Sequence, residues 1–222
     1  MDNPILNLKD YTVAELVIFG VGCFLWILVY FFTLKSIYQR QFIEIPVVTV
    51  WGNIVWEFLW SFVFVPDIGS LFTWGYRIWF FMDCFIVIGA FRYGYKQMNL
   101  PVFVKHFKLL SVFGILAWAP LLYFYIKIYD YPLSKMGAFS GYILNILISG
   151  LYITMALRMN QWKSFSYPAA WCKGVGTLLI SIFCFLHFTD GFLLTMCIIT
   201  GLLDAIYIYL FTKERSNPAA FV

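Results

Sequence analysis

The chain has 222 residues, of which 63% are hydrophobic and 12% are charged, whereas an ordinary soluble domain is roughly 45–50% apolar and about 25% charged. Too few polar side chains remain to cover a compact globule of this size, so the composition excludes a soluble enzyme. It also excludes a disordered chain, which needs low hydrophobicity and high charge. The apolar residues form long continuous runs rather than the alternating segments of a membrane β-barrel. We therefore expect a polytopic helical membrane protein.

A helical membrane span needs about 20 mostly apolar residues, and seven stretches of the chain meet this requirement. Together they use most of the sequence, which predicts one all-α domain over residues 1–222, a single bundle of seven transmembrane helices. The sixth stretch is the weakest because it is short and follows the polar segment 158–173. The expected spans are Val13–Leu34, Pro46–Val65, Trp74–Phe91, Leu109–Ile126, Ala138–Met155, Gly174–Phe188 and Leu193–Phe211.

The lysines and arginines are distributed unevenly between the two ends of these spans. Four lie on the side of the N-terminus and eleven on the other side, among them Lys163 and Lys173. Such residues are retained on the cytoplasmic side during insertion, so we expect the N-terminus outside or in the lumen and the C-terminus in the cytoplasm. The net charge of +4 reflects this bias and indicates no nucleic-acid partner. We expect a multi-pass integral membrane protein, in the endoplasmic reticulum of a eukaryote or the inner membrane of a bacterium.

Three acidic residues lie inside the expected spans: Glu57 in the second, Asp83 in the third and Asp204 in the seventh. An ionisable group in the hydrocarbon region is costly, and its presence suggests a function by default. We expect no lysine or arginine at comparable depth, so a buried ion pair does not account for these acids. Acids without a buried base are protonated or share protons, which makes a proton donor available near neutral pH.

Polar residues at helical spacing form stripes on several of these spans. The plain alternative to a functional role is interhelical hydrogen bonding. We favour that alternative for Asn145 and Ser149. For Glu57 and Asp204 we favour a functional role, because a carboxyl group is a costly way to join helices, and for Asp83 both interpretations stay open. The stripes are Asn53–Glu57–Ser61, Tyr76–Trp79–Asp83, Asn145–Ser149–Tyr152 and Thr200–Asp204–Tyr207.

Aromatic residues make up 22% of the chain. Belts at the membrane interface account for some of them, but Trp51, Trp56, Trp60 and Trp79 lie within spans beside the acids. The faces of such rings stabilise cations that water cannot reach. An acid among aromatic rings in a dry cavity suits chemistry through a carbocation, although most individual rings only fill a helical bundle.

Several motifs are absent from the sequence. It has no aspartate-rich D-D-x-x-D or N-D-x-x-D segment that would hold magnesium and a diphosphate. His106 and His187 have no second ligand at metal spacing. The last span has no lysine before Lys213, so a retinal Schiff base has no attachment point. We therefore expect no metal site and no cofactor.

Two short segments carry a resemblance to a known family. Residues 53–58, Asn-Ile-Val-Trp-Glu-Phe, resemble the N-x-x-W-E-F segment of the membrane-bound terpene cyclases of fungal meroterpenoid and indole diterpene pathways, the pyripyropene and paspaline type. Residues 203–207, Leu-Asp-Ala-Ile-Tyr, resemble the second acidic motif of that family. The resemblance implies an isomerase- or lyase-type enzyme that protonates a terminal epoxide, less often an alkene, on a polyprenyl chain and guides the cation through ring closure. It matches Glu57 and Asp204 to the essential acids of the family.

This resemblance leads to a hypothesis for the site. Glu57 or Asp204 donates the proton while the other adjusts its acidity or binds the emerging hydroxyl group. Asn53 orients Glu57 from one turn away. The remaining substrate-binding candidates are Trp56, Trp60 and Tyr207 as a cation-stabilising wall, together with Asp83. A prenylated substrate, with or without an epoxide, enters from the lipid bilayer, and no obligate protein partner is expected.

Two other functions stay open at this point. In a proton-coupled transporter or channel, the three intramembrane acids would form a relay along a water-lined path. A non-enzymatic lipid or sterol binder would tolerate Glu57→Gln with little loss.

Overall fold

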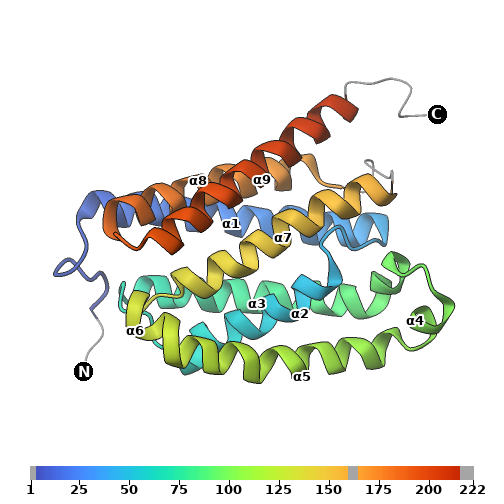
Figure 1. Ribbon diagram of the computed structural model, residues 1–222, viewed down its shortest axis with the longest axis horizontal. Helices are drawn as coiled ribbons and strands as arrows, with labels where there is room; N and C mark the ends of the chain where they lie inside the picture. The colour runs from blue at the N-terminus through green and yellow to red at the C-terminus, as the bar shows by residue number, and fades with distance from the viewer. Residues whose placement is uncertain (1–3, 160–164, 216–222) are drawn as a thin grey trace.

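The computed structural model describes residues 4–159 and 165–215, and every regular element within these ranges is helical. The longer helices run side by side along the long axis of the molecule (Figure 1). A π-helical turn, Leu59–Val63, continues α2, and a second one, Ile126–Asp130, joins α5 to α6. The helices are α1 (Val13–Arg40), α2 (Val47–Phe58), α3 (Ser70–Tyr93), α4 (Pro101–Lys105), α5 (Phe107–Tyr125), α6 (Tyr131–Ser134), α7 (Ala138–Met159), α8 (Tyr167–His187) and α9 (Gly191–Arg215).

The predicted fold class is confirmed. Within the described residues, six helices are long and apolar enough to cross a membrane, and Val47–Val63 is a shorter apolar helix. The second span is therefore the short one, and the expectation that the sixth is weak is wrong. Helix α8 has 21 residues because it begins at Tyr167, well before the expected start at Gly174. The Ser166 side chain caps its N-terminus by accepting a hydrogen bond from the N–H of Ala169.

The connections between the helices gather at two opposite ends of the bundle. At one end the N–H of Asp67, between α2 and α3, donates to the carbonyl of Lys135, between α6 and α7 (3.0 Å). At the other end Gln97 Nε2, after α3, donates to the carbonyl of Ile45, between α1 and α2 (2.7 Å). Successive loops therefore alternate between the two ends, as was assumed when the lysines and arginines were assigned to two sides of the membrane. Lys163 lies outside the described residues. Which end faces the cytoplasm stays a prediction.

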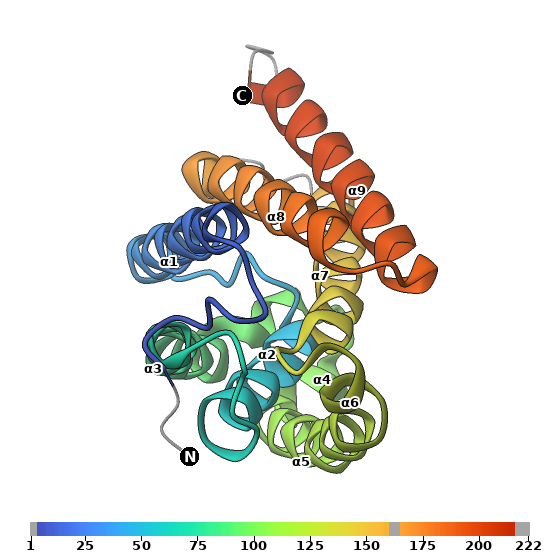
Figure 2. The same ribbon diagram turned by 90° about the vertical axis from the view of Figure 1, so that its left-hand side faces the viewer.

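Helices α1, α3, α2, α7, α9 and α8 form a ring when the bundle is seen from its end (Figure 2). Helix α2 lies between α3, α5 and α7, so α5 covers the outer side of α2. The short helix α2 is thereby enclosed by longer neighbours. This arrangement keeps the side chains on the inward face of α2 away from lipid.

The backbones of α1 and α8 approach closely at two glycines. A Cβ atom on Gly22 would lie 2.8 Å from Ile180 Cγ1 and 3.0 Å from the carbonyl oxygen of Gly176, which leaves no room for a side chain. Small residues at such crossings let transmembrane helices pack by van der Waals contact without a hydrophobic driving force between them. The contact fixes one side of the ring.

A buried carboxyl group ties the α1–α2 connection to the start of α8. The Glu44 side chain is fully buried, and its Oε2 accepts hydrogen bonds from the backbone N–H of Ser166 and from Ser36 Oγ. Burial raises the pKa of Glu44 to about 8, and the hydrogen bonds and the charge of Arg40 oppose this rise only in part. The native state therefore holds a proton on Glu44 in a pH range in which an unfolded chain has released it.

This proton makes the stability of the protein depend on pH. A carboxyl group whose pKa is raised by folding binds more protons in the native state, so stability falls as the pH rises from about 4.5 to about 8. We expect Glu44→Gln in detergent to flatten this decline and to raise the Tm at pH 8 by about 3 °C or more. Thermal unfolding followed at several pH values measures the effect. With Glu214→Gln as control, equal slopes for all three proteins would contradict the prediction.

Candidate active site

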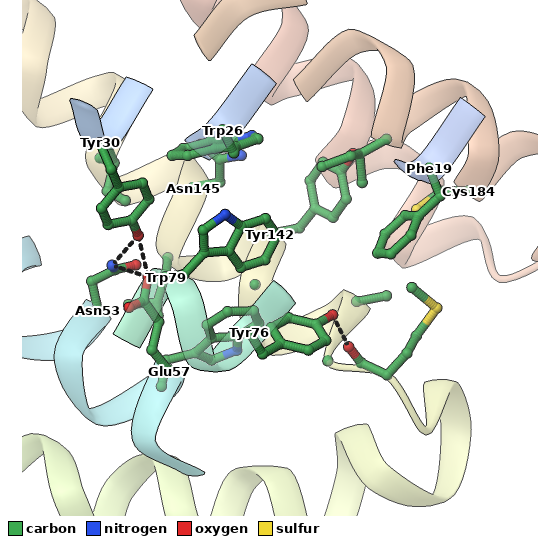
Figure 3. Close-up of a pocket in the computed structure, with 18 residues that line it drawn as sticks. Phe19, Trp26, Tyr30, Asn53, Glu57, Tyr76, Trp79, Tyr142, Asn145 and Cys184 are labelled. Atoms are coloured by element: carbon green, nitrogen blue, oxygen red, sulfur yellow. Dashed lines mark hydrogen bonds between the residues drawn. The ribbon is translucent and has the colours of Figure 1, made fainter. Parts of the chain in front are cut away.

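A cavity of about 100 Å³ lies inside the ring of helices. This volume is smaller than the roughly 300–1,000 Å³ that is typical of small-molecule sites, so side chains of the wall must move to admit a larger molecule. Helices α1, α2, α3, α7 and α8 contribute its wall, which is mostly apolar (Figure 3). Its aromatic side chains are Phe19, Trp26, Tyr30, Trp56, Tyr76, Trp79 and Tyr142. The bundle therefore encloses an aromatic chamber at membrane depth, and we call it the main cavity.

Glu57 lies in the wall of the main cavity and is almost completely buried. Its Oε1 accepts hydrogen bonds from the Tyr30 hydroxyl group and from Asn53 Nδ2 (2.9 Å). Figure 3 shows these three side chains together at one end of the cavity. Its Oε2 is buried and has no hydrogen-bond partner within the described residues. One oxygen is thus held by two donors, and the other is left for a proton or a bound molecule.

A second carboxyl group lies beside Glu57. Asn53 Nδ2 is also 3.4 Å from Oδ2 of Asp83, a buried residue on α3. Among the described residues no lysine or arginine forms an ion pair with either acid. Two neighbouring carboxyl groups without a cation share protons, since both cannot be ionised at low cost. We call Tyr30, Asn53, Glu57 and Asp83 the acid cluster.

Asp204 has a different environment. Its Oδ1 accepts hydrogen bonds from Lys173 Nζ (2.6 Å) and Ser149 Oγ (2.7 Å), and Lys173 Nζ also lies 2.8 Å from Ser149 Oγ. The expectation that no base lies at the depth of the three acids is therefore wrong for Asp204. Lys173 is on the second turn of α8 and not in a loop, because α8 starts at Tyr167. The helix-start signal Ser166-Tyr167-Pro168 is the sequence feature that indicates this placement.

The predicted site residues are divided between two adjoining cavities. Asn53, Trp56 and Glu57 line the main cavity. A second cavity shares Trp26, Tyr30, Asn53 and Ile148 with the first. Its wall also contains Asp83, Lys173 and Tyr207.

Two of the predicted residues lie outside both linings. Trp60 is fully buried, and its Nε1 lies 3.4 Å from Ser140 Oγ. Asp204 lines neither cavity, but it binds Lys173, which lines the second one. Glu57 and Asp204 therefore have different hydrogen-bond partners and are not paired with each other.

The aromatic wall beside Glu57 is held in place by tight contacts. Trp56 Nε1 donates to Ser140 Oγ (2.7 Å), and the Trp56 ring meets the Tyr76 ring edge to face at 5.6 Å. Gly137 has a positive φ of 89°, and a Cβ there would lie 3.0 Å from Trp56 Cζ2. Tyr76 in turn donates to the carbonyl of Met136 (2.8 Å). These rings therefore form a preorganised apolar surface.

Some lining residues were not among the predicted site residues. Tyr30 and Trp26 on α1 and Tyr142 on α7 belong to helices in which aromatic residues are frequent, and no spacing in the sequence distinguishes them. Asn145 is both a helix contact and a cavity residue: its Nδ2 lies 3.4 Å from Thr177 Oγ1, while its buried Oδ1 has no partner within the described residues. The described part of the chain also contains no group of three His, Cys, Asp or Glu side chains that could hold a metal ion.

Comparison with known proteins identifies relatives of this chain. The family model of Pyr4-like transmembrane terpene cyclases matches residues 3–216. A curated relative, the Pyr4-family terpene cyclase mfmH of Annulohypoxylon moriforme, is 20% identical over 158 residues. The match covers 71% of this chain and only 64% of the relative, so the chain spans less than two thirds of that protein. No solved structure matches. The resemblance inferred from the two acidic segments is confirmed.

The arrangement of the acid cluster predicts an observable protonation state. At neutral pH we expect infrared spectra of the purified protein to contain the C=O stretch of a protonated, buried carboxyl group. Difference spectra against Glu57→Gln and Asp83→Asn should assign part of this band to the cluster, because these two acids lack a cationic partner among the described residues. Glu214→Gln is the control. Difference spectra that contain only carboxylate bands would contradict the prediction.

Proposed function

Because the chain belongs to the Pyr4-like transmembrane terpene cyclases, we propose that it closes rings on a polyprenyl substrate inside the membrane, starting with a proton transfer from Glu57. One observation carries this proposal: the buried Oε2 of Glu57 has no partner within the described residues and belongs to a side chain in the wall of an aromatic cavity. An acid in such a place can protonate a bound molecule without competition from water.

The first step is a proton transfer that creates a carbocation. The O–H bond of protonated Glu57 breaks, and its proton goes to a terminal epoxide oxygen, or to an alkene carbon. In the epoxide case the C–O bond to the more substituted carbon then breaks, which leaves a hydroxyl group and a tertiary cation. The Tyr30 hydroxyl group and Asn53 Nδ2 already bind Oε1, so they stabilise the carboxylate that forms.

The aromatic wall supports the later steps. Trp56, Tyr76 and Trp79 present rings to the cavity, and ring faces attract a cation that is shielded from water. Their edge-to-face contacts at 5.6 Å and 5.2 Å leave little freedom to move. Loss of a proton from the last cation ends the reaction, and one proton returns to Glu57. The net change is an isomerisation that needs no metal and no cofactor.

The substrate class follows from the location of the site. The cavity lies within a bundle whose outer surface carries many exposed large apolar side chains, so a substrate dissolved in the bilayer reaches it without crossing water. A prenylated small molecule that carries an epoxide or an alkene has the required solubility and a group that can accept the proton. Trp79 Nε1 and Asn145 Oδ1 are both buried and without a partner within the described residues, so they are available to bind its polar end.

The main test removes the acidic proton. Membranes with wild-type protein and a panel of epoxidised farnesyl and geranylgeranyl aromatics should yield a new chromatographic peak of unchanged mass. Glu57→Gln keeps the shape of the side chain, and we expect it to lower the rate by about 100-fold or more. Glu214→Gln should act as wild type. Proton flux into liposomes together with no product from any substrate would contradict the cyclase and favour a transporter.

Tyr30 gives a second, independent test. Tyr30→Phe keeps the ring but removes one of the two donors to Oε1 of Glu57. Loss of one such donor costs about 100-fold in turnover when charge develops on the acceptor, so kcat should fall while KM changes little. Tyr209→Phe is the matched control, because Tyr209 is exposed on the outer surface. Equal kcat values for the two variants would exclude the proposed role of Tyr30.

A further inference from the structure

We propose that Asp204 acts in this site through Lys173, by neutralising a buried cation next to the reaction cavity. The proposal rests on the proposed function and assigns separate roles to the two acids. Glu57 supplies the proton, and Asp204 supplies a fixed negative charge. Asp204 is thus a positioning residue and not a second acid.

The Lys173 side chain is buried and bound by residues of two neighbouring helices. Lys173 is only 9% exposed, and its ammonium group is bound by Asp204 Oδ1 at 2.6 Å and by Ser149 Oγ at 2.8 Å. The same group lies 5.7 Å from the centre of the Trp26 ring. One cation therefore joins α7, α8 and α9 and touches an indole that lines both cavities.

The hydrogen bonds distinguish the two acids chemically. A carboxylate that accepts a short hydrogen bond from an ammonium group is stabilised in its ionised form, so the geometry places Asp204 as the counter-charge of Lys173. Glu57 accepts its hydrogen bonds from a hydroxyl and an amide group, both neutral. Of the two acids, Glu57 is the one placed to remain neutral until a substrate accepts its proton.

Without Asp204, the positive charge on Lys173 would oppose the proposed reaction. In a low-dielectric interior an unpaired cation acts over a longer range than in water. It would repel a carbocation in the adjoining cavity, and it would favour loss of the proton from the acid cluster before a substrate binds. Paired with Asp204, the ammonium group has little net field. The titratable and charged groups near the ion pair and the acid cluster are Tyr30, Arg40, Glu44, Glu57, Asp83, Cys84, Tyr152 and Tyr207.

A double substitution separates this role from a direct one. Asp204→Asn leaves Lys173 as an unpaired buried cation, and we expect turnover to fall by about 100-fold or more. Lys173→Met combined with Asp204→Asn removes both charges and keeps the side-chain volumes, and it should recover activity to within about tenfold of wild type. Rates are expressed per folded protein, measured from the thermal unfolding transition of each variant.

A second measurement needs no substrate. The pH at which the acid cluster loses its protonated C=O infrared band measures how strongly the charge on Lys173 favours loss of that proton. In Asp204→Asn this pH should fall by about one unit or more, and in the double variant it should return to the wild-type value. A purely structural role of the ion pair would change the amount of folded protein without moving this pH.

The possible outcomes are distinct. A folded double variant as inactive as Asp204→Asn, in a protein whose wild type makes product, would overturn the proposal, because Asp204 would then be needed for itself. An unchanged infrared titration in Asp204→Asn would also overturn it. If instead wild type forms no product while the infrared shift and its reversal occur, the charge relation stands and the cyclase assignment fails.

Discussion

A carboxyl group inside a membrane bundle is costly unless neighbouring groups supply its hydrogen bonds, and in Glu57 only one of the two oxygens has such partners. Tyr30 and Asn53 bind Oε1, while Oε2 remains without a partner within the described residues. The rest of the site depends on this asymmetry. The ring of helices keeps lipid and water away from the free oxygen, and the aromatic wall replaces both with rings that can face a cation.

The sequence predicts the parts of this site that depend on positions within one helix. Asn53 and Glu57 are one turn apart, so their contact follows from helical spacing alone, and the buried stripe containing Asp83 follows likewise. The seven apolar segments are also readable from composition. Composition does not define where a segment begins or ends. By composition the sixth span starts at Gly174, which places Lys173 in a loop, whereas α8 begins at Tyr167. The capping residue Ser166 and Pro168 set that boundary, and a hydropathy pattern contains no information on capping.

Contacts between helices could not be predicted in the same way. Tyr30 is one of fifteen tyrosines, and only the packing of α1 beside α3 directs its hydroxyl group at Glu57. Trp60 is adjacent to the acids in sequence, yet its ring is packed toward Ser140, outside the cavity lining. The resemblance to a family singled out Glu57 and Asp204 among the acids. It gave no indication that Asp204 is paired with a cation and that Glu57 is not.

The close approach of Gly22 to Gly176 has a consequence for the size of the chamber. Phe19 and Trp26 flank Gly22 on α1, and Ile180 follows Gly176 by one turn on α8, so the contact runs along the cavity wall. Side chains can change rotamer to admit a bulkier guest, but two backbones in contact cannot separate without moving whole helices. The separation of α1 and α8 is therefore fixed, and the chamber can change its width on this side only through the rotamers of the side chains that line it.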